Sequence, residues 1–145
     1  MALPRNLEEI EGEFRLYDEL SEDPRAERNS LVIDLGRALE PMPEALKTDE
    51  TQVTGCASRV WVYPVPGSSK DQLLFYADSN SGLTKGIIAI ILMIVQGKTA
   101  REVLATDIEG ELEPLGLQKH FSSLRTSGLK NMIVKIRETA ERLAS

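Results

Sequence analysis

The sequence predicts an α+β fold in which about five helices pack against a small antiparallel sheet of two or three strands. Apolar residues recur at helical spacing near both ends of the chain, whereas β-branched and aromatic residues gather in two neighbouring runs, 59–65 and 73–77. Pro66-Gly67 begins the turn between these runs, which makes them the arms of a hairpin. Strands do not alternate with helices, so a doubly wound parallel sheet is not expected. The 145 residues are expected to form a single domain, 1–145.

Capping residues mark the starts of the first two helices. Asn6 precedes the first apolar periodicity, and Glu9 follows three residues on, which is an asparagine variant of the capping box. Asp23 and Pro24 begin the second helix, because proline needs no backbone donor at the first helical position. Pro41 ends that helix, since proline restricts the residue before it.

The most apolar stretch, 86–95, is predicted to be a helix that is buried on nearly all sides. The helix should begin at the cluster of capping residues 78–81 and end at Gly97. Its roughly 10 apolar residues are about half of what a bilayer requires, and Lys85 and Lys98 close it on both sides. We therefore expect no membrane span and no membrane partner.

The remaining segments give weaker signals. Thr99 is expected to cap a short helix, and the last helix is predicted over about 128–143 from the apolar face that it carries. Residues 44–54 are polar and are predicted to be a loop with room for one helical turn. Residues 106–116 are predicted to be irregular, again with one helical turn.

Composition narrows the function classes. Seventeen Lys and Arg against 23 Asp and Glu give a net charge of −6, and nucleic acid is therefore not expected as a partner, because phosphate binding needs a basic face. A single cysteine fits a reducing compartment, and the N-terminus carries no apolar signal core. We expect a cytoplasmic protein, or an organellar one if a transit peptide has been removed.

Cys56 is the only cysteine, which limits the chemistry to what one thiol can do. One thiol forms no internal disulfide and holds no iron–sulfur cluster within one chain. From position alone, packing in the core and nucleophilic reaction are about equally favoured. Gly55 and Ser58 place the thiol in a loop and favour reaction, and Arg59 nearby could favour the nucleophilic thiolate.

Other candidate residues have weaker claims. His120 is the only histidine, and it could activate Cys56 only if the fold brings the two together; a surface or capping role is the favoured interpretation. Arg125 is either solvated or a charged contact for a partner. Trp61 is predicted to be a core residue on a face of the sheet, with an interface role as the alternative. The sequence contains no HExxH or CxxC metal spacing.

Several blocks of the sequence together resemble the SufE family. Along the chain these blocks occur in the same order as in the family: a Gly-Cys block leading to Val-Trp, the entry of a buried helix, and a C-terminal signature. The likeness covers nearly the whole chain, from about Leu7 to the end. The matching blocks are Val53-Thr54-Gly55-Cys56-Ala57-Ser58-Arg59-Val60-Trp61, Asp78-Ser79 with Lys85-Gly86-Ile87-Ile88-Ala89, and 117–129 followed by Met132-Ile133 and Ile136-Arg137.

This resemblance implies a fold similar to the U-type cluster scaffolds, and a sulfur-transfer function. The family accepts sulfur from a cysteine desulfurase that uses pyridoxal phosphate, here a SufS-like or CsdA-like enzyme, and stimulates that enzyme. By position Cys56 is the acceptor, which takes the sulfur as a persulfide and passes it to an iron–sulfur scaffold. No cofactor of its own is expected, and the chain should be a monomer or a weak dimer.

The same resemblance makes five residues possible supporting or partner-contact residues: Gly55, Ser58, Arg59, His120 and Arg125. One departure from the family occurs, because Ser123-Leu124-Arg125 stands where family members often have Ser-Pro-Ser-Arg. A scaffold function is not expected, since a scaffold needs several ligating thiolates for each cluster. Two alternatives stay open: a module that binds a desulfurase without carrying sulfur, and a single-thiol redox sensor.

Overall fold

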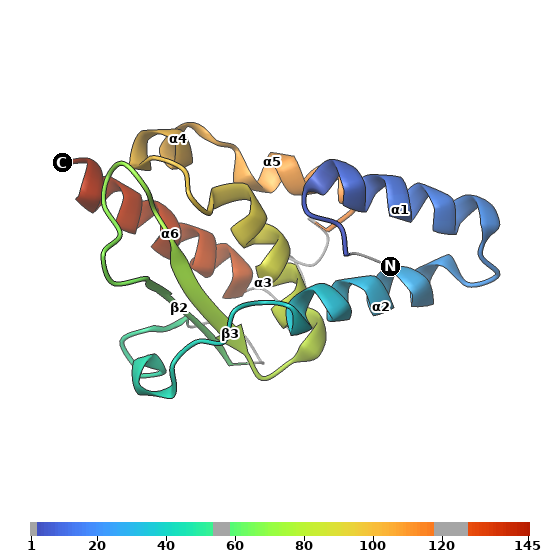
Figure 1. Ribbon diagram of the computed structural model, residues 1–145, viewed down its shortest axis with the longest axis horizontal. Helices are drawn as coiled ribbons and strands as arrows, with labels where there is room; N and C mark the ends of the chain where they lie inside the picture. Colours follow the sequence, from blue (N-terminus) through green and yellow to red (C-terminus); the bar gives the residue numbers. More distant parts are fainter. Residues whose placement is uncertain (1–2, 54–58, 118–127) are drawn as a thin grey trace.

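The computed structural model describes residues 3–53, 59–117 and 128–145, and it confirms the predicted α+β fold (Figure 1). The described chain holds six α-helices, two short 3₁₀ helices and three strands. In chain order these are α1 (Leu7–Leu20), α2 (Pro24–Arg37), η1 (Glu44–Leu46), β1 (Gln52–Val53), β2 (Val60–Pro64), β3 (Phe75–Ser79), α3 (Gly82–Val95), α4 (Ala100–Ala105), α5 (Ile108–Leu112), η2 (Glu113–Leu115) and α6 (Gly128–Ala144).

The strands form one antiparallel sheet with β2 in the centre. β2 and β3 are the arms of the predicted hairpin, although β3 begins at Phe75 rather than at Leu73. Leu73 belongs instead to a contact with the turn after α3. Its N–H donates to the carbonyl of Lys98 (2.9 Å), and its carbonyl accepts from the N–H of Gly97 (2.7 Å).

β1 is the element that the sequence prediction missed, because residues 44–54 were predicted to be a loop. The strand consists of Gln52 and Val53, which pair with Trp61 and Val60 of β2. Two residues are too few to show the alternation that identifies a strand. Residues 106–116, predicted to be irregular with one helical turn, are more helical than expected, since α5 and η2 occupy most of the segment.

The predicted helix starts are confirmed. The side chains of Asn6 and Asp23 each accept a hydrogen bond from the backbone N–H three residues on, at 2.9 and 3.1 Å. Thr99 and Glu102 form a reciprocal capping box at the start of α4. These caps satisfy backbone donors that have no partner within a helix.

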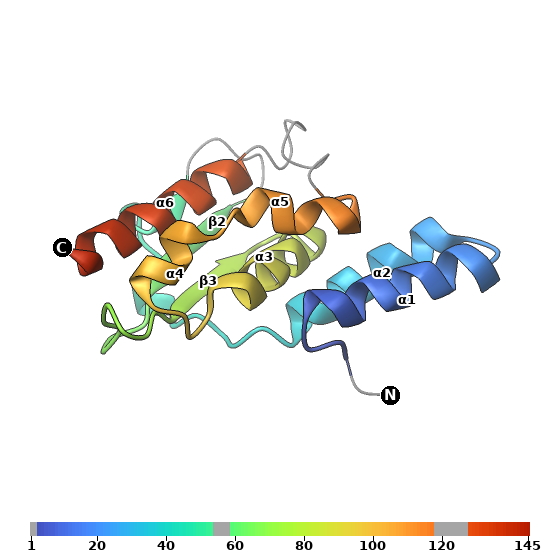
Figure 2. The same cartoon turned by 90° about the horizontal axis from the view of Figure 1, so that it is seen from above.

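Helices α3 and α6 cover one face of the sheet, with α3 against β3 and α6 against β1 and β2. Val60, Val62, Phe75 and Ala77 point inward and join the apolar side chains of these helices in one core. α1 and α2 lie side by side, and α2 packs against α3. The α1–α2 pair therefore extends from one end of the body (Figure 1, Figure 2).

α3 is the buried helix that the apolar run predicted. Ser81 caps it, because its side chain accepts a hydrogen bond from the N–H of Thr84 (3.4 Å). Ile87, Ile88 and Ile91 have no exposed surface. In the described part of the chain, no helix is long and apolar enough to cross a membrane.

Glycines allow α2 and α3 to approach closely. A Cβ atom on Gly86 would lie 2.0 Å from the carbonyl oxygen of Val32, and one on Gly36 would lie 2.7 Å from the backbone nitrogen of Gly86. Both contacts are with backbone atoms, so no rotation of a side chain could relieve them. The position of α3 against α2 therefore depends on glycine at these two sites.

We expect Gly86→Ala to lower the free energy of unfolding by about 3 kcal/mol, because the new methyl group forces the two helices apart. Urea denaturation followed by circular dichroism measures this change. Gly12→Ala is the matched control, since Gly12 is exposed on α1 and its added methyl group would meet no atom within 4 Å. That variant should gain about 0.5–1 kcal/mol. Wild-type stability in Gly86→Ala would contradict the tight contact between the helices.

Candidate functional site

The candidate thiol is attached to the paired ends of two strands. β1 ends at Val53, β2 begins at Val60, and these two residues are partners in the antiparallel register. The residues between them that lie outside the described residues include three of the predicted site: Gly55, Cys56 and Ser58. Because the chain is continuous, the segment 54–58 is tethered at both ends to fixed points of the sheet.

Arg59 is the predicted site residue that the structure describes, and it is exposed. Its N–H donates to Oδ1 of Asn80 (2.9 Å), and its carbonyl accepts from the N–H of Asn80 (3.3 Å). These two hydrogen bonds lie next to the Val60–Ser79 pair, and they extend the contact between the two strands by one residue pair. The point at which the chain leaves 54–58 is therefore fixed by β3.

Two further predicted residues, His120 and Arg125, lie in 118–127, which is outside the described residues. The surface or capping role favoured for His120 and the possible partner contact of Arg125 stay predictions. The effect of the Arg59 guanidinium on the thiol also stays a prediction.

The first turns of α3 and α6 lie at the same end of the sheet as the paired strand ends. α3 begins at Gly82, shortly after the end of β3. α6 runs in the same direction as β2: Lys135 donates to the carbonyl of Gln52 (3.0 Å), and Arg142 further along lines a groove with Pro64. Helix N-termini carry partial positive charge, so this end of the sheet favours an anionic group such as a thiolate.

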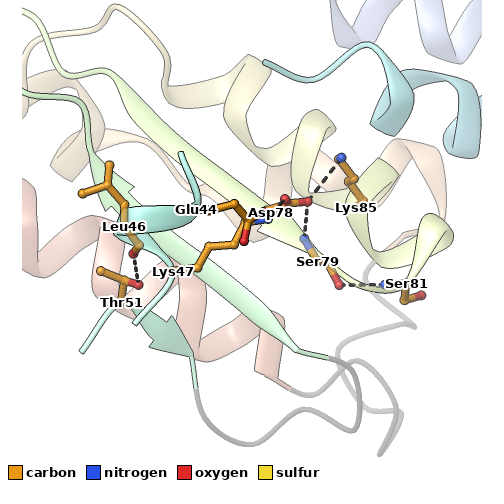
Figure 3. A network of polar contacts seen from close by, with 8 residues as sticks. All are labelled: Glu44, Leu46, Lys47, Thr51, Asp78, Ser79, Ser81 and Lys85. Carbon is orange, nitrogen blue, oxygen red and sulfur yellow. Dashed lines mark hydrogen bonds and ion pairs between the residues drawn. The ribbon is translucent and has the colours of Figure 1, made fainter. Parts of the chain in front are cut away.

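On the outer face of the sheet, Asp78 of β3 joins two lysines (Figure 3). Its Oδ2 lies 2.7 Å from Nζ of Lys47, and its Oδ1 lies 3.2 Å from Nζ of Lys85. Oδ1 also accepts the backbone N–H of Ser79 at 2.8 Å. The Asp78 side chain is only 12% exposed. Because Lys47 precedes β1 and Lys85 is in the first turn of α3, one carboxylate joins three parts of the fold.

Opposing effects set the pKa of Asp78. Burial acts to raise it, because a buried carboxylate loses hydration. Hydrogen bonds from Lys47, the N–H of Ser79 and Lys85 outweigh burial, and the pKa of Asp78 lies below its usual 3.8. The hydrogen bond to Asp78, followed by the bond to Glu44, raises the pKa of Lys47. The Asp78 and Lys47 side chains are therefore both charged at neutral pH.

Trp61 lies beside this cluster and not in the core, so the prediction of a core tryptophan was wrong. Strand alternation turns Val60 and Val62 inward and leaves Trp61 half-buried on the outer face, paired with Asp78 across the strands. Nζ of Lys47 lies 5.4 Å from the centre of the Trp61 ring, within the range of a cation–π contact.

Sequence reasoning missed the Asp78 cluster, because Asp78 was assigned to the capping residues of α3 and Lys47 to a polar loop. Two signals point to it. Aspartate is depleted in strands, and Asp78 follows a strand-like run directly. A lysine in the first turn of a helix lies at the positive end of the helix dipole, which disfavours its charge. An anion is therefore expected near Lys85.

The described residues contain no group of three or more His, Cys, Asp or Glu side chains that could hold a metal ion. The Asp78 cluster itself contains two cations around one carboxylate, which is unsuited to binding a cation. Among the described residues, the site thus consists of the paired strand ends that flank 54–58, the first turns of α3 and α6, and the Asp78 cluster on the outer face of the sheet.

Comparisons with known proteins point to one family. A family model described as SufE, Fe–S metabolism associated domain, matches residues 14–140. A SufE-like protein of Rhizobium meliloti (strain 1021), described as uncharacterized, is 38% identical over 138 residues, which is 94% of this chain and 95% of the relative. A second such protein, from Rhizobium etli, is 35% identical over 138 residues, which is 94% of this chain and 90% of the relative.

A solved structure shares the fold. The solution structure of a hypothetical protein from Thermus thermophilus matches with a TM-score of 0.66, covering 99% of this chain and 98% of the other. The sequence identity is 18%, so this likeness concerns the fold alone.

We expect wild type to be more stable than Asp78→Asn by about 1–3 kcal/mol at neutral pH, because the variant loses charged hydrogen bonds. A carboxyl group whose pKa is lowered by folding contributes stability above its unfolded pKa, here about 3.8. That contribution is lost as the pH falls through the lower folded pKa. The stability difference should therefore shrink below about pH 4, as urea unfolding at several pH values will measure.

The matched control for this pH series is Asp71→Asn, which changes an exposed aspartate in the turn before β3. Its stability should stay within about 0.5 kcal/mol of wild type throughout. An Asp78→Asn difference that stays constant down to pH 3 would contradict the assigned role of the Asp78 charge.

Proposed function

Because the chain belongs to the SufE family, whose domain is associated with iron–sulfur metabolism, we propose that it is a sulfur acceptor for a cysteine desulfurase. Cys56 receives the sulfur and holds it as a persulfide. The chain also stimulates the desulfurase by removing its product, and it passes the sulfur on to an iron–sulfur scaffold.

The proposed reaction is an exchange at sulfur without net oxidation or reduction. The Cys56 thiolate attacks the outer sulfur of the persulfide on the desulfurase cysteine. A new S–S bond forms at Cys56, the S–S bond of the desulfurase breaks, and the desulfurase cysteine leaves as a thiolate. Pyridoxal phosphate belongs to the desulfurase in this scheme, and the acceptor binds no cofactor of its own.

The observation that carries the proposal is the solitary Cys56 within a family-matched segment whose two ends are held by β1 and β2. A second thiol within reach would attack the persulfide, form a disulfide and release the sulfur as sulfide. The helix N-termini of α3 and α6 also support the proposal, because their positive ends favour a thiolate over a thiol.

Mass spectrometry of the intact chain after incubation with a desulfurase and L-cysteine tests this function. We expect the chain to gain the mass of one sulfur atom at Cys56, and dithiothreitol to remove it. Cys56→Ser should gain no sulfur and should lose most of the stimulation of the desulfurase. Full stimulation by Cys56→Ser would contradict the acceptor role.

A binding measurement and treatment with peroxide and glutathione separate the alternatives. Binding to the desulfurase without added sulfur would identify a binding module that does not carry sulfur. No reaction with the desulfurase, but rapid conversion of Cys56 to a sulfenic acid or a mixed disulfide by peroxide and glutathione, would identify a redox sensor.

A further inference from the structure

Asp78 occupies a position that sheet formation alone does not favour. Aspartate is depleted in strands, and partial burial opposes its charge. Lys85, one of its partners, stands in the first turn of α3, where the helix dipole disfavours a cation. The position of Asp78 is therefore better explained by the segments that it connects than by the sheet itself.

The contact between Asp78 and Lys47 holds the chain that leads into the thiol-bearing segment. Lys47 begins the turn before β1, and this turn is closed by the Thr51 hydroxyl, which donates to the carbonyl of Leu46 at 2.6 Å (Figure 3). β1 follows at once and ends at Val53. The Lys47 side chain thus crosses β2 at Trp61 to reach the carboxylate on β3, and this contact holds the chain just before β1.

Arg59, which follows the segment, is held by Asn80, two residues after Asp78. Oδ1 of Asp78 binds the N–H of Ser79, and the next residue, Asn80, exchanges two hydrogen bonds with Arg59. Lys85 binds the same Oδ1 and adds the first turn of α3 to this arrangement. The described residues before and after 54–58 are thus linked to Asp78, Lys47 directly and Arg59 through Asn80 and Ser79.

We propose that Asp78 is a positioning residue for sulfur transfer at Cys56, because its bond to Lys47 holds the chain before β1, and its bonds to the N–H of Ser79 and to Lys85 hold the end of β3 beside Arg59. The inference rests on the proposed function. Asp78 forms no bond to sulfur in the transfer. Correct orientation of two reacting groups raises the reaction rate by a large factor, and small displacements lower that rate steeply. Loss of Asp78 should therefore reduce the transfer rate more than the affinity for the desulfurase.

The test measures sulfur transfer to Cys56 over a range of acceptor concentrations with a desulfurase and L-cysteine. For Asp78→Asn we expect the rate at saturating acceptor to fall by about fivefold or more, as expected for lost orientation. The acceptor concentration for half-maximal rate should change by less than about twofold. Asp78→Glu keeps the charge and should recover part of the lost rate.

Gln96→Ala is the matched control for a general weakening of β3. The Gln96 side chain binds both backbone groups of Phe75, its Nε2 at 3.0 Å from the carbonyl and its Oε1 at 2.8 Å from the nitrogen. This contact lies at the end of β3 remote from 54–58. We expect a near wild-type transfer rate for Gln96→Ala.

Lys47→Met is the second variant, and it carries the test if Asp78→Asn is too unstable to purify. It removes the contact between Lys47 and Asp78, which holds the chain before β1, while Asp78 and Lys85 stay paired. Trp61, the only tryptophan, reports on this link, because Lys47 lies over its ring. We expect altered Trp61 emission in Lys47→Met and a lower saturating transfer rate.

The outcomes separate the inference from the function on which it rests. If wild type gains no sulfur at Cys56, the proposed function and this inference both fall. If wild type gains sulfur and the Asp78 and Lys47 variants match its saturating rate, only the inference falls. An equal loss of rate in Gln96→Ala would also overturn it, because the effect would then follow the stability of β3.

Discussion

The pairing of Val60 with a neighbouring strand on each side is the constraint on which the candidate site depends. Val60 is fully buried, and it pairs with Val53 of β1 and with Ser79 of β3. Antiparallel order then places the end of β1, the start of β2 and the end of β3 together. α3 begins just beyond, and its N-terminal end joins them. A one-residue slip of this register would turn the core face of β2 outward, so the arrangement is strongly specified.

The fold and the proposed chemistry make separate demands on this end of the sheet. The core requires apolar residues and close contact between helices, which Gly36 and Gly86 allow where α2 meets α3. Sulfur transfer requires one thiol, presented to a partner enzyme with no second thiol nearby. Asp78 serves both demands, because it lies in the sheet and its charge is paired with Lys47, ahead of β1, and with Lys85 of α3. The proposed acceptor cysteine thus lies in the sequence between two strands of a rigid scaffold, and such connections often carry functional residues.

The sequence predicts the elements that repeat over many residues or begin with a clear cap. The apolar run of α3 and the caps at Asn6, Asp23 and Thr99 belong to this group. β1 escapes prediction because two residues show no period. The Asp78 cluster escapes because Lys47, Asp78 and Lys85 come from separate segments, and no local pattern indicates that they meet. The sequence singles out Cys56, and its surroundings lie outside the described residues.

The central claim is that Cys56 takes sulfur directly from a desulfurase, and a single-turnover experiment tests it most directly. A desulfurase carrying one persulfide, freed of L-cysteine, is mixed with an equal amount of this chain and quenched at intervals. Sulfur should appear on the Cys56 peptide as fast as it leaves the desulfurase, with no free sulfide until a reductant is added. Release of sulfide into solution with Cys56 unmodified would contradict the claim.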